Sequence, residues 1–411
     1  MSAILDKHLG RVCILLFLYT CWSYLITYTI YENFILRQAI SLFIMFYMLF
    51  IISKKKNFSS SEYVLWVPFL LYITIGGLLN NSINISIYWF VSMTLLLVAP
   101  YSKLYKHIPL KLVTGFGIIM VVGIFFQIFF PDIYYSRIVN IFTTSDEILS
   151  WYGYTGYAGF TYQLGMTGGM LLIAEAAVYS LYRSTDINNK QRKIYKWLVV
   201  LFIIGVFMTG KRTFCLLSII IPFLTDFLQQ KNSSKKIVVL LSCLLVVYGG
   251  YFILANYPEL VSDIKGLNRL ADSIRGAQHG EDISSNRDYL YRLAWEAFDS
   301  NPILGVGVGN FTIVTDASTS VHNSYLKILC EQGILGFVLF LIPMLTCFIT
   351  SVRIARLCVV TNIYMTFSIF IQLFFILYSF TGNTTTDLWG YVIYFIAIAT
   401  MISVKYDQKT I

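Results

Sequence analysis

About twelve apolar runs, each long enough to cross a bilayer, constrain this chain more than any other feature. A membrane-spanning helix needs about 20 predominantly apolar residues, and runs of roughly that length recur along most of the sequence. They lie near residues 12–31, 34–52, 64–80, 84–100, 110–130, 164–182, 195–209, 212–229, 237–254, 333–351, 360–380 and 386–403. The sequence therefore predicts an all-α polytopic membrane protein with about 12 transmembrane helices, folded as a single membrane domain over residues 1–411.

The basic residues predict the orientation of these spans. With the N-terminus inside the cell and the spans alternating, the cytoplasmic connections receive about two-thirds of all Lys and Arg. This matches the excess of positive charge that cytoplasmic loops carry. Both termini are then cytoplasmic, and residues 255–332, between the ninth and tenth spans, form one large extracytoplasmic loop. No small-residue cleavage site follows the first run, which favours a retained signal anchor.

The overall charge does not require a nucleic-acid partner. Only 12% of the residues are charged and 57% are hydrophobic, far from the balance of a soluble domain. The net charge of +9 is explained by basic cytoplasmic loops, so we expect membrane lipid around the chain and no nucleic acid. The sequence shows no internal repeat, which counts against a transporter built from two similar halves.

The loop at 255–332 is the only long polar segment, and it predicts two helices. In the first, Ser284 or Ser285 is a candidate cap, and Asn301-Pro302 ends the helix. Its apolar side repeats at helical spacing, at Leu290, Leu293, Ala294 and Ala297. Arg287 lies in the first turn, either as a solvated surface residue or as part of a site. A second helix opens at His322, which is either an interfacial polar residue or a base whose pKa the helix end lowers.

Glycines alternate between these two helices, at Gly305, Gly307 and Gly309 in GVGVGNF. Their spacing is not that of a dinucleotide-binding fingerprint, and no βαβ pattern surrounds them. We interpret the segment as a tight loop with exposed backbone N–H groups.

Two further positions place charge at or inside the membrane. Lys211 and Arg212 fall between two apolar runs with almost no connection, which predicts a sharp turn that points both cations into a cavity. The alternative is a pair that snorkels to the surface. Glu175 lies within the sixth span and should face the bundle interior, where it pairs with an arginine, serves catalysis or couples to protons.

These residues together suggest a class of chemistry. Arginine forks suit phosphate oxygens, and a lipid-linked diphosphate at the membrane surface needs such a cradle. A histidine nearby could take a proton from an incoming hydroxyl. This describes glycosyl transfer from a lipid diphosphate carrier.

The chain resembles the O-antigen polymerase and O-antigen ligase superfamily of bacterial membrane proteins. The resemblance rests on NRDYLYRLAWEAFDSNPILGVGVGNF, on VHNSYLKILCEQGILGF and on an arginine between two middle spans, in TGKRT. The residues that follow the family's order are Arg212, Arg287, Pro302, Gly305, Gly307, Gly309, His322, Asn323, Gly333 and Gly336. Tyr291 departs mildly from the pattern, because the family usually has tryptophan there.

The resemblance implies a GT-C-like, inverting and metal-independent glycosyltransferase without a cofactor, in the bacterial inner membrane. Its substrate would be an undecaprenyl diphosphate-linked glycan. Arg212 and Arg287, with Lys211, would bind the diphosphate, and His322 would activate the acceptor hydroxyl. Asn323, Glu175 and the three alternating glycines are candidate supporting residues.

The expected activity is that of an O-antigen or capsular polysaccharide polymerase, which extends a lipid-linked repeat unit at the outer face; a chain-length regulator is a candidate partner. The alternatives are an O-antigen ligase that transfers the glycan to lipid A-core and, in another class, a flippase for the lipid-linked oligosaccharide.

Overall fold

The computed structural model describes most of the chain from residue 61 onward. The described stretches are 61–82, 107–143, 155–161, 163–185, 187–281, 286–357, 363–386 and 388–409, with single residues at 43, 46, 47, 50, 85, 89, 92, 93 and 96. Within these stretches the regular elements are helices and none is a β-strand. This confirms the predicted all-α, polytopic class.

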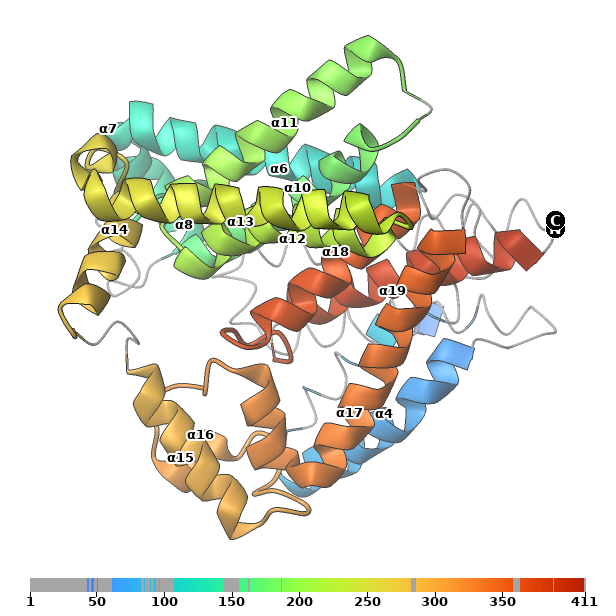
Figure 1. The fold of residues 1–411 in the computed structure, drawn as a ribbon. Coiled ribbons are helices and arrows are strands. Elements are labelled where there is room, and N and C mark those ends of the chain that lie inside the picture. Colours follow the sequence, from blue (N-terminus) through green and yellow to red (C-terminus); the bar gives the residue numbers. More distant parts are fainter. Residues whose placement is uncertain are drawn as a thin grey trace.

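Nine long helices of the described part carry the fold (Figure 1). They are α4 (Ser61–Leu79), α6 (His107–Phe129), α10 (Leu164–Tyr182), α11 (Asn189–Met208), α12 (Arg212–Gln229), α13 (Ser233–Asn256), α17 (Ser324–Leu357), α18 (Ile363–Tyr378) and α19 (Leu388–Lys409). Each coincides with a predicted span, to within a few residues at most ends. The exceptions are α11, which begins six residues before its predicted span, α17, which extends beyond its span at both ends, and α19, which ends six residues after its span.

Among the described helices, α4, α6, α10, α12, α13 and α17 are long and apolar enough to cross a membrane. The predicted spans at 12–31 and 34–52, and most of 84–100, lie outside the described residues. The total of about twelve therefore remains a prediction.

Helix α10 forms the centre of the bundle. It packs against α6, α11, α12 and α18, and most of its length is buried. Small residues permit this close packing, because a Cβ added at Gly168 would collide with the ring of Phe214 on α12. The functional site described below therefore includes the start of a tightly packed helix, α10.

Aromatic side chains join α4, α17 and α19 into a second part of the core. The ring of Trp66 lies 5.2 Å from that of Phe395 and 6.0 Å from that of Phe340, both edge-on. Phe69 meets Trp89 at 5.0 Å in the same geometry. Edge-to-face pairs at such separations are the favoured aromatic arrangement. These aromatic pairs hold α17 in place, and the first turns of α17 form part of the functional site.

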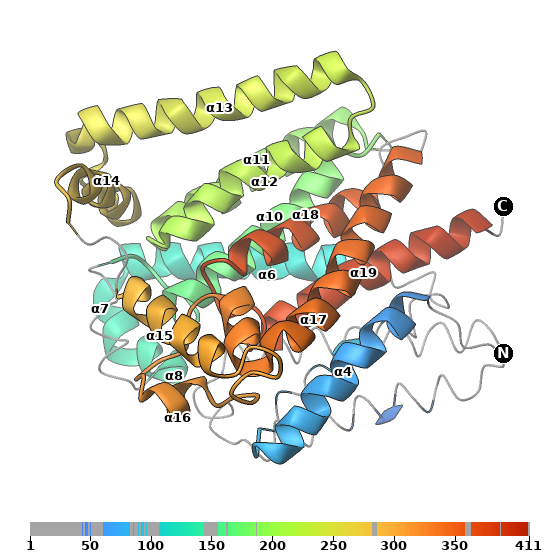
Figure 2. The ribbon, with the colours of Figure 1, turned by 60° about the horizontal axis from the view of Figure 1, so that its bottom comes forward.

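Helix α13 lies apart from the bundle. Figure 2 shows it along one side of the molecule, separated from most of the other helices. Only 6% of its most apolar window is buried inside the protein, and it packs mainly against α12 and α14. A helix this apolar and this exposed is suited to lipid contact.

The predicted polar loop at 255–332 is helical, as expected, but it contains α14 and α16 in addition to the two predicted helices. It contains the 3₁₀ turn η3 (Pro258–Val261), α14 (Lys265–Gln278), α15 (Arg287–Ser300), α16 (Phe311–Thr315) and the first turns of α17. Helix α14 packs beside α11, α12 and α13, whereas α15 and α16 pack on α17. Figure 1 shows these two parts at separate places on the bundle.

The amphipathic pattern predicted for the first loop helix is confirmed in α15. Leu290, Ala294 and Ala297 are buried, and Leu293 is half-buried. These side chains form a small core with Phe311 and the start of α17. The proposed caps Ser284 and Ser285 lie outside the described residues.

Shorter elements complete the described part of the chain. After α6 the backbone continues through α7 (Pro131–Ile133), a π-helical segment η2 (Tyr134–Ile138) and α8 (Val139–Phe142). Tyr134 is fully buried there and donates a hydrogen bond to the carbonyl of Gly159 at 2.5 Å. This bond holds the segment before α10 against η2.

Candidate functional site

The turn between α11 and α12 is sharp, as predicted. Its tightest residue is Gly210, with φ +66°, where an added Cβ would collide with the carbonyl oxygen of Thr155. Only glycine adopts this conformation without strain in so little space. The turn leaves Lys211 half-buried, and its side chain passes over Gly165 at the start of α10.

Helix α14 contributes a further arginine to this turn. Arg269 donates to the carbonyl of Gly210 at 3.4 Å, and Arg212 donates to the hydroxyl of Ser273 at 2.9 Å. The close approach depends on Gly266, where a Cβ would strike the carbonyl oxygen of Phe207 at the end of α11. Sequence reasoning did not place Arg269 at this turn.

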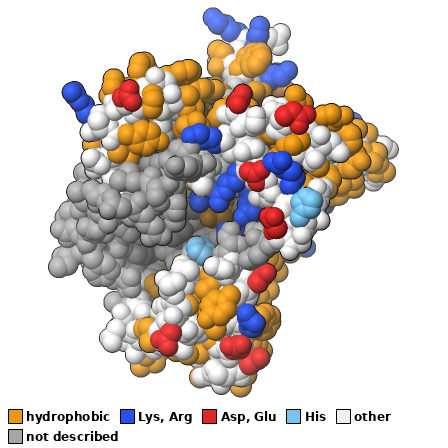
Figure 3. Space-filling model, turned by 90° about the vertical axis from the view of Figure 1, so that its left-hand side faces the viewer, with side chains coloured by type: hydrophobic (Ala, Val, Ile, Leu, Met, Phe, Trp, Pro, Cys, Tyr) orange, Lys and Arg blue, Asp and Glu red, His pale blue; other side chains and the backbone are white. Residues whose placement is uncertain are grey.

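Four positive side chains therefore meet at one place, and we call Lys211, Arg212, Arg269 and Arg287 the cation cluster. Burial, together with the charges of Arg269, Arg287 and Arg212, lowers the pKa of Lys211 to about 8. Burial and the charge of Arg212 likewise lower the pKa of Arg269. In the space-filling view, Lys and Arg side chains gather at the centre of one face (Figure 3).

The cation cluster has few internal counter-charges. Among the described residues, the ion pairs join Arg183 to Asp226, Arg275 to Asp272, Lys327 to Glu331 and Lys405 to Glu62. None of these involves Lys211, Arg269 or Arg287. Arg287, the first residue of α15, also makes no hydrogen bond with its side chain within the described part. Like charges held together in this way favour an anionic ligand.

His322 lies beside this cluster, before the start of α17. Its φ of +55° is uncommon for a residue other than glycine and is typical of functionally constrained positions. Burial lowers the pKa of His322, as do the charges of Arg287, Lys211 and Lys327. The lowered pKa favours the neutral form of the ring at pH 7. The helix itself begins at Ser324, two residues after the predicted start.

Asn323 has a structural role in the described chain. Its side-chain oxygen accepts the backbone N–H of Leu326 at 3.1 Å, which caps the first turn of α17. It therefore helps to place the segment that carries His322.

The interpretation of the glycine segment as a set of exposed N–H groups is wrong. The N–H of Gly305 donates to the carbonyl of Asn301 at 2.8 Å, and that of Gly307 to the carbonyl of Glu331 at 2.9 Å. The N–H of Gly309 donates to the carboxylate of Glu331 at 3.0 Å. Their φ values, +73°, +105° and +81°, explain why glycine is needed there. The segment is fastened to α17 and offers none of these three donors to a ligand.

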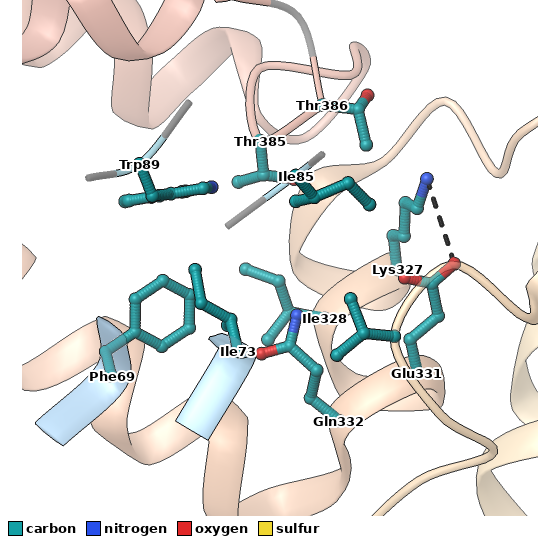
Figure 4. Close-up of a pocket in the computed structure, with 11 residues that line it drawn as sticks. Phe69, Ile73, Ile85, Trp89, Lys327, Ile328, Glu331, Gln332, Thr385 and Thr386 are labelled. Atoms are coloured by element: carbon teal, nitrogen blue, oxygen red, sulfur yellow. Dashed lines mark ion pairs between the residues drawn. The ribbon is translucent and has the colours of Figure 1, made fainter. Parts of the chain in front are cut away.

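Sequence reasoning missed Glu331. The buried carboxylate accepts from Gly309 and from the N–H of Phe311 at 3.4 Å, and it pairs with Lys327 at 3.8 Å. Figure 4 shows Lys327 and Glu331 side by side at the edge of a narrow cavity. An acidic residue inside an otherwise apolar helical run, just before Gly333, was the available signal.

Sequence reasoning also missed Asn383, in the connection between α18 and α19. Its amide nitrogen lies 3.3 Å from Nδ1 of His322. The two residues are 61 positions apart, so no local pattern relates them.

Glu175 faces the bundle interior, as expected, and belongs to a different region. It is fully buried, and neither carboxylate oxygen has a hydrogen-bond partner within the described part. The nearby arginine at the end of α10, Arg183, pairs instead with Asp226 at 3.2 Å. Glu175 lies ten residues beyond Gly165 on α10, about 15 Å along the helix axis, and so does not join the cation cluster.

The comparison with known protein families identifies this region. Residues 197–341 match the family model described as O-antigen ligase. The match includes the whole cation cluster, His322 and Glu331, whereas Asn383 and Glu175 lie outside it. No curated protein matches the chain.

Proposed function

The chain is a membrane protein of the O-antigen ligase and polymerase superfamily, and from this membership and its cation cluster we propose that it transfers glycan from a lipid-linked diphosphate. In the favoured form it is a polysaccharide polymerase. It would join a growing chain on undecaprenyl diphosphate to a lipid-linked repeat unit at the outer face of the bacterial inner membrane.

The cation cluster is the observation that carries this proposal. Arginine presents a planar fork that matches phosphate oxygens, and lysine adds a compact charge. Lys211, Arg269 and Arg287 have no carboxylate partner among the described residues, so a bound diphosphate would relieve their mutual repulsion. The cluster also lies at the end of membrane helices, where the headgroup of a lipid carrier is found.

The chemistry that this arrangement favours is displacement of the diphosphate. An acceptor hydroxyl oxygen forms a bond to the anomeric carbon, and the bond from that carbon to the diphosphate oxygen breaks. The electron pair leaves with the diphosphate, whose increased charge the guanidinium groups and Lys211 stabilise. Preorganised charges of this kind are usually the largest contribution to catalysis.

His322 is the group next to the cluster that can exchange a proton near neutral pH. The resemblance implies that it activates the acceptor hydroxyl. Its neutral form, which burial and the surrounding cations favour, is the form that such a role requires.

The ligase is the second candidate, because the matching family is described as O-antigen ligase. Both reactions share the diphosphate donor and differ only in the acceptor. The discriminating experiment supplies the purified protein with lipid-linked glycan and either a lipid-linked repeat unit or lipid A-core. The acceptor that becomes extended identifies the activity.

A test in vesicles separates transfer from transport. We expect lengthened glycan with wild-type protein, no product with Arg287→Ala, and full activity with Arg275→Ala, whose exposed side chain pairs with Asp272. Movement of the lipid across the bilayer without bond formation would show a flippase instead. Activity should persist in EDTA; strong inhibition would contradict a metal-independent mechanism.

A further inference from the structure

The imidazole of His322 has a polar contact at each of its two ring nitrogens. Its Nδ1 lies 3.3 Å from the amide nitrogen of Asn383, and its Nε2 lies 3.5 Å from the exposed hydroxyl of Thr319. An amide nitrogen only donates hydrogen bonds, so Nδ1 must accept. In a neutral ring the single proton is then on Nε2.

A chain of hydrogen bonds determines which way the amide of Asn383 points. Lys327 has only donors and lies 3.4 Å from the hydroxyl oxygen of Ser320, which must accept. The hydroxyl of Ser320 in turn donates to the side-chain oxygen of Asn383 at 3.3 Å. The amide nitrogen is thereby left to face His322.

The opposite orientation of the amide satisfies fewer groups. It would turn the amide nitrogen toward Ser320, whose oxygen can accept from both the amide and Lys327, but the hydroxyl proton of Ser320 would lose the acceptor that it has in Asn383. Amide orientations are assigned by this kind of accounting. Glu331 pairs with Lys327 at 3.8 Å and helps to keep its ammonium in place.

The backbone around Asn383 is also fixed. Ser324 donates from its N–H to the carbonyl of Ser379 and from its hydroxyl to that of Gly382, each at 2.8 Å. Thr384 donates to the hydroxyl of Ser324 at 3.0 Å. The residues on both sides of Asn383 are therefore tied to the start of α17, two positions after His322.

We propose that Asn383 is a positioning residue that keeps the proton of neutral His322 on Nε2, so that the ring presents a hydrogen-bond donor beside the cation cluster. That the receiving group is a diphosphate oxygen rests on the proposed function. The placement of the proton on Nε2 does not rest on the proposed function.

This assignment changes the role of His322. With its proton on Nε2 and with Nδ1 engaged, the neutral ring has no free lone pair for an incoming alcohol. In the proposed transfer His322 instead donates a hydrogen bond to the diphosphate. The proton of the alcohol is released to solvent, and the diphosphate oxygen keeps the electron pair of its broken bond to the sugar.

The test is nitrogen-15 NMR of the full-length protein in lipid nanodiscs, labelled at histidine. The chain has only 4 histidines, and His322→Gln identifies the signal of His322. At a pH where the ring is neutral, we expect the imine-type shift on Nδ1 and the N–H-type shift on Nε2. One hydrogen bond of ordinary strength should favour this form by roughly fivefold.

Two variants test the cause. Asn383→Asp replaces a donor by a group that only accepts, and it should move the proton to Nδ1. Asn383→Leu should leave a mixture of both forms. His279, exposed at the end of α14, is the internal control and should not change.

A wild-type spectrum with the proton on Nδ1, or with both forms equally populated, overturns the proposal, even if neither variant folds. Failure to detect the proposed transferase activity would not overturn the proposal about the tautomer, because the spectrum is recorded without turnover.

Discussion

The carboxylate of Glu331 accepts the backbone N–H of Gly309 at 3.0 Å. This contact joins the glycine segment after α15 to the first turns of α17, and it determines how the two halves of the site meet. α15 begins at Arg287, and the residues just before α17 carry His322. The geometry of the site therefore depends on a buried acid that itself touches no substrate group.

Glu331→Ala should destabilise the protein by about 1–3 kcal/mol, because it leaves the N–H groups of Gly309 and Phe311 without an acceptor. Thermal unfolding in detergent measures the change. Glu296→Ala removes an exposed carboxylate on α15 and is the matched control, with no expected shift. Equal unfolding temperatures for the two variants would contradict the role assigned to Glu331.

Gly266→Ala should displace α14 and weaken anion binding. Its added Cβ would collide with the backbone of Phe207, so Arg269 would leave the turn at Gly210. Binding of inorganic pyrophosphate, measured by calorimetry, should fall by about tenfold, the effect of losing roughly 1.4 kcal/mol. Gly250→Ala, on α13 with open space around it, is the control. Unchanged affinity in Gly266→Ala would show that α14 does not contribute.

Affinity for pyrophosphate should decline above pH 8 in a way that depends on Lys211. The pKa of this residue is lowered to about 8, so its charge, which favours an anion, is lost as the pH rises through that value. The loss should be about fivefold, as for one charge interaction of about 1 kcal/mol in a water-like dielectric. Pyrophosphate itself gains charge over this range, so the wild type is compared with Lys211→Met, in which the decline should be absent.

Arg287→Gln should raise the pKa of His322. Burial lowers that pKa most, and the positive charge of Arg287 lowers it further. Removing this charge therefore makes the imidazolium easier to form. The histidine-labelled spectrum followed against pH reports the change directly. Arg275→Gln removes an exposed arginine of α14 and should leave the titration as it is. An unchanged pKa of His322 in Arg287→Gln would place the two side chains far apart.

Hydrophobic periodicity predicted the elements of this fold well. The spans expected at 164–182 and 212–229 are those of α10 and α12, because a bilayer-length apolar run has few alternatives to a helix. The turn at Gly210 was also predictable, since two cations in the middle of one long helix are costly.

The partners of the site residues were harder to predict. Arg269 reaches the turn only because α13 reverses the chain, and Asn383 meets His322 across 61 residues. Such contacts depend on tertiary packing, which periodicity does not encode. The glycine segment was misinterpreted for the same reason. The N–H groups of Gly307 and Gly309 are satisfied by Glu331, a residue that lies more than 20 positions later.

The length of α13 sets the distance between the end of α12 and the start of α14. Its 24 residues extend about 36 Å at 1.5 Å per residue, from the end of α12 back to the start of α14. Because little of its side surface touches the bundle, its length matters more than the identity of its apolar residues. Removing one turn would draw α14 about 5 Å short of the Gly210 turn and take Arg269 away from its three cationic neighbours.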